Sequence, residues 1–95
     1  MNPGEVWRLD DNGGLRLVLS NATYNASGLN RVITAVVTPD AAGSFDPFAV
    51  ACRAGVVRVD RIAMHPRTWL KEPVSQLTDE QYAAVREHVQ FLFDW

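Results

Sequence analysis

The side chains that could do chemistry in this sequence are arginines and hydroxyl residues near the ends of short apolar runs. A guanidinium group can stabilise the negative charge that develops on a phosphodiester in a transition state, and it needs no metal to do so. A hydroxyl at a strand end can orient a phosphate oxygen. The basic candidates are Arg8, Arg16, Arg53 and Arg58 within the runs, with Arg67 and Lys71 in the segment that follows. The alternative is that each is an ordinary solvated surface residue.

Other kinds of chemistry find little support in the residue pattern. The two histidines, His65 and His88, have no partner at metal-ligand spacing, so neither a metal site nor a cofactor is predicted. His88 falls on an apolar helical stripe, which predicts a packing role with one ring nitrogen hydrogen-bonded. Cys52 lies in the apolar run FAVAC and is predicted to be a buried small side chain rather than a nucleophile. The common phosphate-loop, dinucleotide-binding and serine-nucleophile motifs do not occur.

Composition and charge limit the class of protein. A chain of 95 residues, with 47% hydrophobic and 21% charged residues, is predicted to be one globular domain over residues 1–95. A core this small is marginal, which favours a homodimer. The formal net charge of −2 is not that of a dedicated nucleic-acid binder, although the nine Lys and Arg could form a local patch. The chain shows no apolar signal segment and no membrane-spanning run, so we expect a cytoplasmic protein without membrane contact.

A series of short predicted strands would position the candidate residues. The expected strands are residues 5–10, 15–20, 31–38, 48–53 and 55–59, with 61–64 as a further short strand and 69–77 as an extended segment. Residues 31–38 are rich in β-branched side chains and largely apolar on both faces, which predicts a central strand that ends before Pro39. Residues 21–30 and 40–47 are expected to be surface loops.

The dipeptide Asn12-Gly13 between the first two strands predicts a two-residue hairpin turn. Centring the turn there would place Trp7 opposite Val18 and Leu9 opposite Arg16. Short turns of this kind favour antiparallel pairing and a small twisted barrel or half-barrel.

The last segment is the one clearly predicted helix. Thr78 and Gln81 form a capping box, and the acidic residues between them favour the positive end of the helix dipole. One apolar stripe consists of Tyr82, Val85, Val89 and Leu92, and a second of Ala84, His88, Phe91 and Trp95. A lone helix packed on one sheet needs only one apolar stripe. The second stripe therefore predicts either that the helix is deeply buried against the sheet or that it contacts another subunit.

Taken in order, several segments resemble the MazF/PemK family of toxin endoribonucleases from bacterial toxin–antitoxin pairs. The segments are GEVW at Gly4–Trp7, LVLSN at Leu17–Asn21 followed by Tyr24-Asn25, VITAVVTP at Val32–Pro39, VRVDRI at Val57–Ile62 and LTDEQ at Leu77–Gln81. The resemblance implies a mainly β fold with a C-terminal helix, an SH3-like small barrel of the CcdB/MazF/PemK type. It also implies a homodimer, metal-independent cleavage of single-stranded RNA at short sequences, and inhibition by a cognate antitoxin.

The sequence departs from the family at one catalytic position. The family usually has Arg-Pro just before the second strand, and the matching place here is Gly14-Leu15. Arg16 lies two positions further on, on the same side of the strand and displaced by about 6.6 Å. The family's strand-end Ser/Thr maps to Thr38. Catalysis is therefore assigned to Arg16 and Thr38, and RNA binding is assigned to Arg8, Ser20, Asn21 and Arg53.

Two alternatives to the endoribonuclease remain open at this point. CcdB-like toxins use the same fold to poison DNA gyrase, and the aromatic ending FLFDW at Phe91–Trp95 is reminiscent of theirs. The other alternative is a catalytically inactive barrel that only binds its antitoxin. The sequence favours the endoribonuclease toxin of a type II toxin–antitoxin pair, with unstacked RNA held in a groove shaped by residues 21–30 and 40–47.

Overall fold

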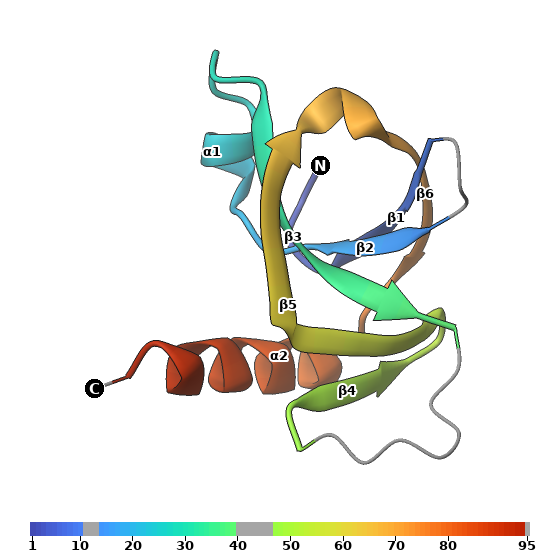
Figure 1. The fold of residues 1–95 in the computed structure, drawn as a ribbon, viewed down its shortest axis with the longest axis vertical. Helices are drawn as coiled ribbons and strands as arrows, with labels where there is room; N and C mark the ends of the chain where they lie inside the picture. The colour runs from blue at the N-terminus through green and yellow to red at the C-terminus, as the bar shows by residue number, and fades with distance from the viewer. Residues whose placement is uncertain (11–13, 40–46, 95) are drawn as a thin grey trace.

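The computed structural model describes residues 1–10, 14–39 and 47–94 of the chain. Within these ranges six antiparallel strands form one curled sheet, and a C-terminal helix packs against it (Figure 1). The elements are β1 Glu5–Leu9, β2 Leu15–Val18, α1 Ala22–Asn25, β3 Arg31–Thr38, β4 Ala49–Cys52, β5 Gly55–Pro66, the 3-10 turn η1 Arg67–Trp69, β6 Leu70–Gln76 and α2 Asp79–Leu92. The strand order is β4-β5-β3-β2-β1-β6.

Strand β3 is an inner strand of the sheet, as its β-branched sequence predicts, and it has the predicted bounds. It pairs with β2 on one side and with β5 along its whole length on the other. Its alternating side chains enter two separate hydrophobic clusters, with Ala35 and Val37 in one and Val32 in the other. Both faces of β3 are thus covered, which explains why neither face of its sequence is polar.

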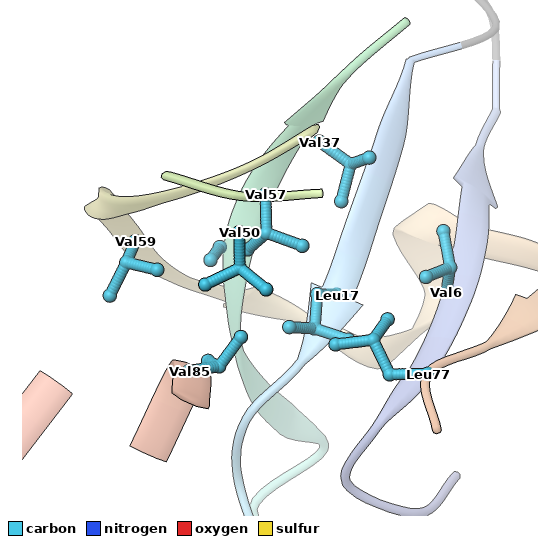
Figure 2. Close-up of a cluster of buried hydrophobic side chains, with 9 residues drawn as sticks. Val6, Leu17, Val37, Val50, Val57, Val59, Leu77 and Val85 are labelled. Carbon is cyan, nitrogen blue, oxygen red and sulfur yellow. The ribbon is translucent and has the colours of Figure 1, made fainter. Parts of the chain in front are cut away.

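The larger cluster lies between the sheet and α2 and joins most elements of the fold (Figure 2). Its buried members are Val6, Leu17, Ala35, Val37, Val50, Val57, Val59, Leu77 and Val85. Val85 is the one fully buried residue that the described part of α2 contributes, and it lies against valines of β4 and β5. Burying one such side chain stabilises the fold by about 1.5–3 kcal/mol.

Strand β5 is one long bent strand, where the sequence predicted two short ones at 55–59 and 61–64. Its register against β3 shifts between Ala35, which pairs with Ile62, and Val36, which pairs with Arg58. The extra residues on β5 form a bulge that bends the strand without ending it. The first part of β5 also pairs with β4, and the second part continues to Pro66.

The predicted β1–β2 register is wrong by two residues. Trp7 pairs with Arg16 and not with Val18, and the backbone N–H of Leu9 donates to the carbonyl of Gly14 at 2.7 Å. Asn12-Gly13, where the turn was predicted, lies outside the described residues. A shift of two residues preserves the face of every side chain, because the side-chain period of a strand is two.

The link between β2 and β3 contains a single helical turn, α1, where a surface loop was predicted. Asn21 is its N-cap, and the side-chain oxygen of Asn21 accepts a hydrogen bond from the backbone N–H of Tyr24 at 2.8 Å. An asparagine that can cap the first free N–H groups is enough to start such a turn.

Helix α2 confirms the predicted capping box, with hydrogen bonds in both directions between Thr78 and Gln81. His88 also has its predicted packing role, because its Nδ1 lies 3.1 Å from the carbonyl of Phe48 and its ring meets the Phe48 ring edge-on. Cys52 is only half-buried, at the rim of the larger cluster, so the prediction of full burial is wrong. Trp95 lies outside the described residues.

Replacing Thr78 with Ala is expected to lower the free energy of unfolding by about 1 kcal/mol, because the first turn of α2 loses its side-chain acceptor. Urea denaturation of the purified protein measures this change. Thr78→Ser keeps the hydroxyl and serves as the control. Equal stability of the Ala variant and the wild type would show that the capping box contributes nothing.

Burial raises the pKa of the Tyr82 hydroxyl, and the charge of Arg86 offsets part of the increase. A pKa raised on folding gives stability that is complete below the unfolded-state pKa and lost as pH rises through the folded-state pKa. The unfolding free energy of the wild type should therefore fall above about pH 10 more steeply than that of Tyr82→Phe. Denaturation curves between pH 8 and pH 11 test this, with Tyr24→Phe as control; identical pH dependence of wild type and Tyr82→Phe would contradict it.

Candidate active site

The two residues to which catalysis was assigned lie on one face of the sheet, on adjacent strands. Arg16 of β2 pairs directly with Val36 of β3, and Thr38 is two residues further along β3 on the same face. Diagonal neighbours of this kind lie about 7–8 Å apart, within reach of a long side chain. Both side chains are partly exposed. The structure thus brings Arg16 and Thr38 together at the end of β3.

A second arginine reaches Thr38 from the opposite side. Val36 pairs with Arg58 of β5, so Arg58 lies on the same face as Arg16 and Thr38. The Arg58 Nε–H donates a hydrogen bond to Thr38 Oγ1 at 3.2 Å. Arg16, Thr38 and Arg58 are called the Thr38 cluster below. The sequence identified Arg58 as a basic strand residue but did not place it beside Thr38, because that placement depends on the β3–β5 register.

The backbone at Thr38 is held by close packing against the start of β5. Gly55 has φ +143°, and a Cβ built on it would lie 2.2 Å from the carbonyl oxygen of Thr38 and 3.1 Å from Cα of Pro39. Only glycine combines this φ with such a close approach. Gly55 therefore fixes where the end of β3 lies and, with it, the Thr38 side chain.

Two of the predicted RNA-binding residues, Arg8 and Arg53, are also brought together. They line one open pocket of about 300 Å³ with Leu15, Ala54, Val74 and Ser75. Arg8 pairs with Leu15, the neighbour of Arg16, so this pocket lies on the opposite face of the sheet from the Thr38 cluster. Arg8 also forms an exposed ion pair with Glu72 of β6, a kind of contact that contributes little to stability.

The other two predicted RNA-binding residues lie towards the far end of β2. Ser20 is buried, and its hydroxyl donates to the Asn25 side chain and accepts from the Ile33 backbone N–H at 3.0 Å. Asn21 caps α1. Ser20 is four residues from Arg16, or about 13 Å along a strand. The structure thus gives both side chains an internal partner and does not bring them to the Thr38 cluster; their RNA contacts stay predictions.

One buried polar group was not anticipated from the sequence. His65 is buried, with Nε2 2.9 Å from Thr34 Oγ1 and Nδ1 2.9 Å from the carbonyl of Pro66. Its ring stacks on Trp69 at 5.4 Å between centroids. No residue spacing links Thr34 to His65, since they meet only through the β3–β5 pairing. The described ranges contain no group of three or more His, Cys, Asp and Glu that could hold a metal ion.

A scan against protein-family models and a search of the curated proteins found no match to this chain. Solved structures, in contrast, match it from end to end. MazF in the MazE–MazF complex from Deinococcus radiodurans is 28% identical in sequence and superimposes with a TM-score of 0.82, covering 97% of this chain and 94% of that one. A mycobacterial endoribonuclease in complex with its cognate antitoxin has a TM-score of 0.84 at 19% identity, covering 100% of this chain and 98% of that one.

The Mycobacterium tuberculosis toxin MazF-mt6 has the same fold at a greater distance, with a TM-score of 0.68, 23% identity and coverage of 99% and 100%. Together these structures confirm the predicted fold class, a mainly β barrel of the MazF type with a C-terminal helix. The resemblance found in the short sequence segments therefore extends to the whole three-dimensional fold.

Replacing Gly55 with Ala is expected to lower the free energy of unfolding by about 1–3 kcal/mol, because the new methyl group meets the Thr38 backbone in a strained conformation. Thermal and urea denaturation measure the loss. Gly28→Ala is the matched control, since a Cβ at Gly28 would meet no atom within 4 Å. If both variants unfolded like the wild type, the close approach of Gly55 to Thr38 would not constrain the site.

Proposed function

We propose that this chain, which is similar from end to end to the MazF toxins, is the toxin of a type II toxin–antitoxin pair and a metal-independent endoribonuclease. The observation that carries the proposal is the full-length likeness to MazF at 28% identity and a TM-score of 0.82. It is supported by the Thr38 cluster, where a hydroxyl and two guanidinium groups meet at one strand end. Guanidinium and hydroxyl groups can bind a phosphodiester and stabilise the charge that develops on it without a bound metal.

In the proposed mechanism Thr38 orients the scissile phosphate and Arg16 stabilises the charge that develops on it. A hydroxyl donates to a phosphate oxygen, and a guanidinium can donate two parallel hydrogen bonds to the same group. The substrate is single-stranded RNA, whose bases can be unstacked and recognised one at a time. Arg8 and Arg53, whose shared pocket lies on the opposite face of the sheet, are proposed to bind the RNA backbone beyond the scissile phosphate.

The proposed partner is a cognate antitoxin. Structures similar to this chain were solved with one: the mycobacterial endoribonuclease with its cognate antitoxin and the Deinococcus radiodurans MazF with MazE. The likeness covers nearly the whole of both proteins, so the surfaces available for such a partner are also comparable in extent. We place the pair in the cytoplasm, where its RNA substrate is made; in the described part of the chain no helix is long and apolar enough to span a membrane.

We further propose a homodimer, with the second copy covering an apolar groove of about 420 Å³ between α2 and the β3–β5 surface. The groove is lined by Leu19, Ser20, Ile33, Ile62, Ala63, Met64, Val89 and Phe93. Met64 is 57% exposed and Phe93 66% exposed. Large apolar side chains gathered in one groove are typical of a protein interface, and dimer burial would add to a small core.

The gyrase-poison alternative rested on the aromatic C-terminus. In the structure Phe91 stacks on Phe48 at 5.7 Å between ring centroids, and Phe93 lines the apolar groove. Both rings remain largely exposed, at 65% and 66%, so their positions do not decide between the two functions. The MazF likeness favours the endoribonuclease.

Purified protein is expected to cut a long single-stranded RNA at discrete sites in the presence of EDTA. Arg16→Ala and Thr38→Val should each lower the cleavage rate by about 100-fold or more, because each removes a group that contacts the phosphate. Arg31→Ala is the matched control, since Arg31 is exposed at the opposite end of β3. Mapped fragment ends give the cleavage sequence. Intact RNA with folded wild-type protein would refute the proposed function, and full activity of both variants would refute the site.

A further inference from the structure

Arg58 is placed unusually for a strand arginine. Its exposed fraction is 9%, so it is almost as buried as the valines on either side of it in β5. Arginine is rarely buried to this degree unless its guanidinium group has a polar role. The Nε–H of Arg58 donates to Thr38 Oγ1 at 3.2 Å, across the β3–β5 pair. A positive charge is therefore held next to the hydroxyl that the proposed mechanism uses.

Within the described residues, in contrast, the proton of the Thr38 hydroxyl has a distant acceptor. Thr38 Oγ1 lies 3.5 Å from the carbonyl of Val56, to which it donates. Hydrogen bonds between a hydroxyl and an oxygen are usually 2.5–3.0 Å long, so this bond is weak. The oxygen of Thr38 is thus engaged by Arg58, while its proton can turn to a better acceptor without losing a strong bond.

We propose that Arg58 is a positioning residue for catalysis, which acts by fixing the Thr38 hydroxyl with its proton directed at the scissile phosphate. This inference rests on the proposed endoribonuclease function. A guanidinium N–H that donates to Oγ1 leaves the hydroxyl free to donate onward, which forms a chain from Arg58 through Thr38 to a phosphate oxygen. Donation by a charged group polarises the hydroxyl and strengthens the bond that it makes in turn.

The proposal divides the work of the Thr38 cluster between its two arginines. Arg16 is partly exposed and reaches the phosphate directly, whereas Arg58 is buried and acts through Thr38. The two arginines flank Val36 from the two neighbouring strands, so their positive charge surrounds the end of β3 from both sides. Removing Arg58 would leave Thr38 in place but would free its side chain to rotate and would remove the charge beside it.

A double-mutant cycle in the full-length protein tests this division. Arg58→Met is neutral and similar in length, and it should lower kcat for cleavage of an RNA oligonucleotide by roughly 100-fold while KM changes by less than about 3-fold. Arg58→Lys, which keeps the charge, should recover part of the loss. Arg61→Met is the matched control, an exposed arginine on the same strand. Circular dichroism confirms that each variant is folded.

The decisive comparison is made in the Thr38→Val background. If Arg58 acts through Thr38, adding Arg58→Met to Thr38→Val should lower kcat by less than about 2-fold more, because the two residues then form one unit. If the effects of the two substitutions on kcat multiply, the proposal is overturned. It is also overturned if Arg58→Met alone cuts RNA like the wild type. A merely structural Arg58 would instead lower stability and kcat additively with Thr38.

An NMR measurement gives a readout that does not depend on cleavage. The Arg58 Nε–Hε signal is followed while a single-stranded 2′-deoxy oligonucleotide, which lacks the hydroxyl that could attack the phosphate, is added. The signal should shift in the wild type and not in Thr38→Val. If the Arg58 signal of the wild type does not shift when the oligonucleotide is added, the inference is overturned. If the wild type fails to cut RNA but the signal responds, the endoribonuclease function fails while the Arg58–Thr38 contact to the phosphate backbone stands.

Discussion

The pairing of β3 with β5 along its whole length, and with β2 over Thr34–Val37, is the constraint on which the rest of the structure depends. A strand hydrogen-bonded to β2 and to β5 cannot shift without breaking two ladders at once. It therefore fixes which side chains enter the cluster under α2, which enter the smaller cluster on the other face, and which are left at its end. The Thr38 cluster occupies that end, so its geometry follows from backbone pairing rather than from loop conformation.

The bend in β5 allows one sheet to serve two small cores. The first part of β5 pairs with β4 and covers the larger cluster. The second part continues along β3, where His65 of β5 pairs with Val32 of β3. A straight strand of that length could not do both. The bulge lies directly beside the Val36–Arg58 pair, between that pair and the Ala35–Ile62 pair. The bend that curls the sheet therefore adjoins the candidate site.

Much of the fold could be predicted from the sequence because local physics dominates there. The β-branched run of β3 and the capping box at Thr78 depend only on neighbouring residues, and both were predicted correctly. The β1–β2 register and the continuity of β5 were not, because they depend on how strands meet in space. The site followed the same division. Thr38 shares a face with Val36 through simple alternation, while its meeting with Arg16 of β2 and Arg58 of β5 depends on strand register.

The burial of Arg58 has a consequence for the evolution of the sequence at this position. Taking a guanidinium group out of water is costly, and replacing buried ionic groups by apolar side chains of similar size often stabilises a protein by about 1–4 kcal/mol. A lineage selected only for folding or abundance would therefore tend to lose the charge at position 58. If Arg58 positions Thr38 as proposed, the charge at position 58 exchanges some stability for activity, one strand away from the residue that it contacts.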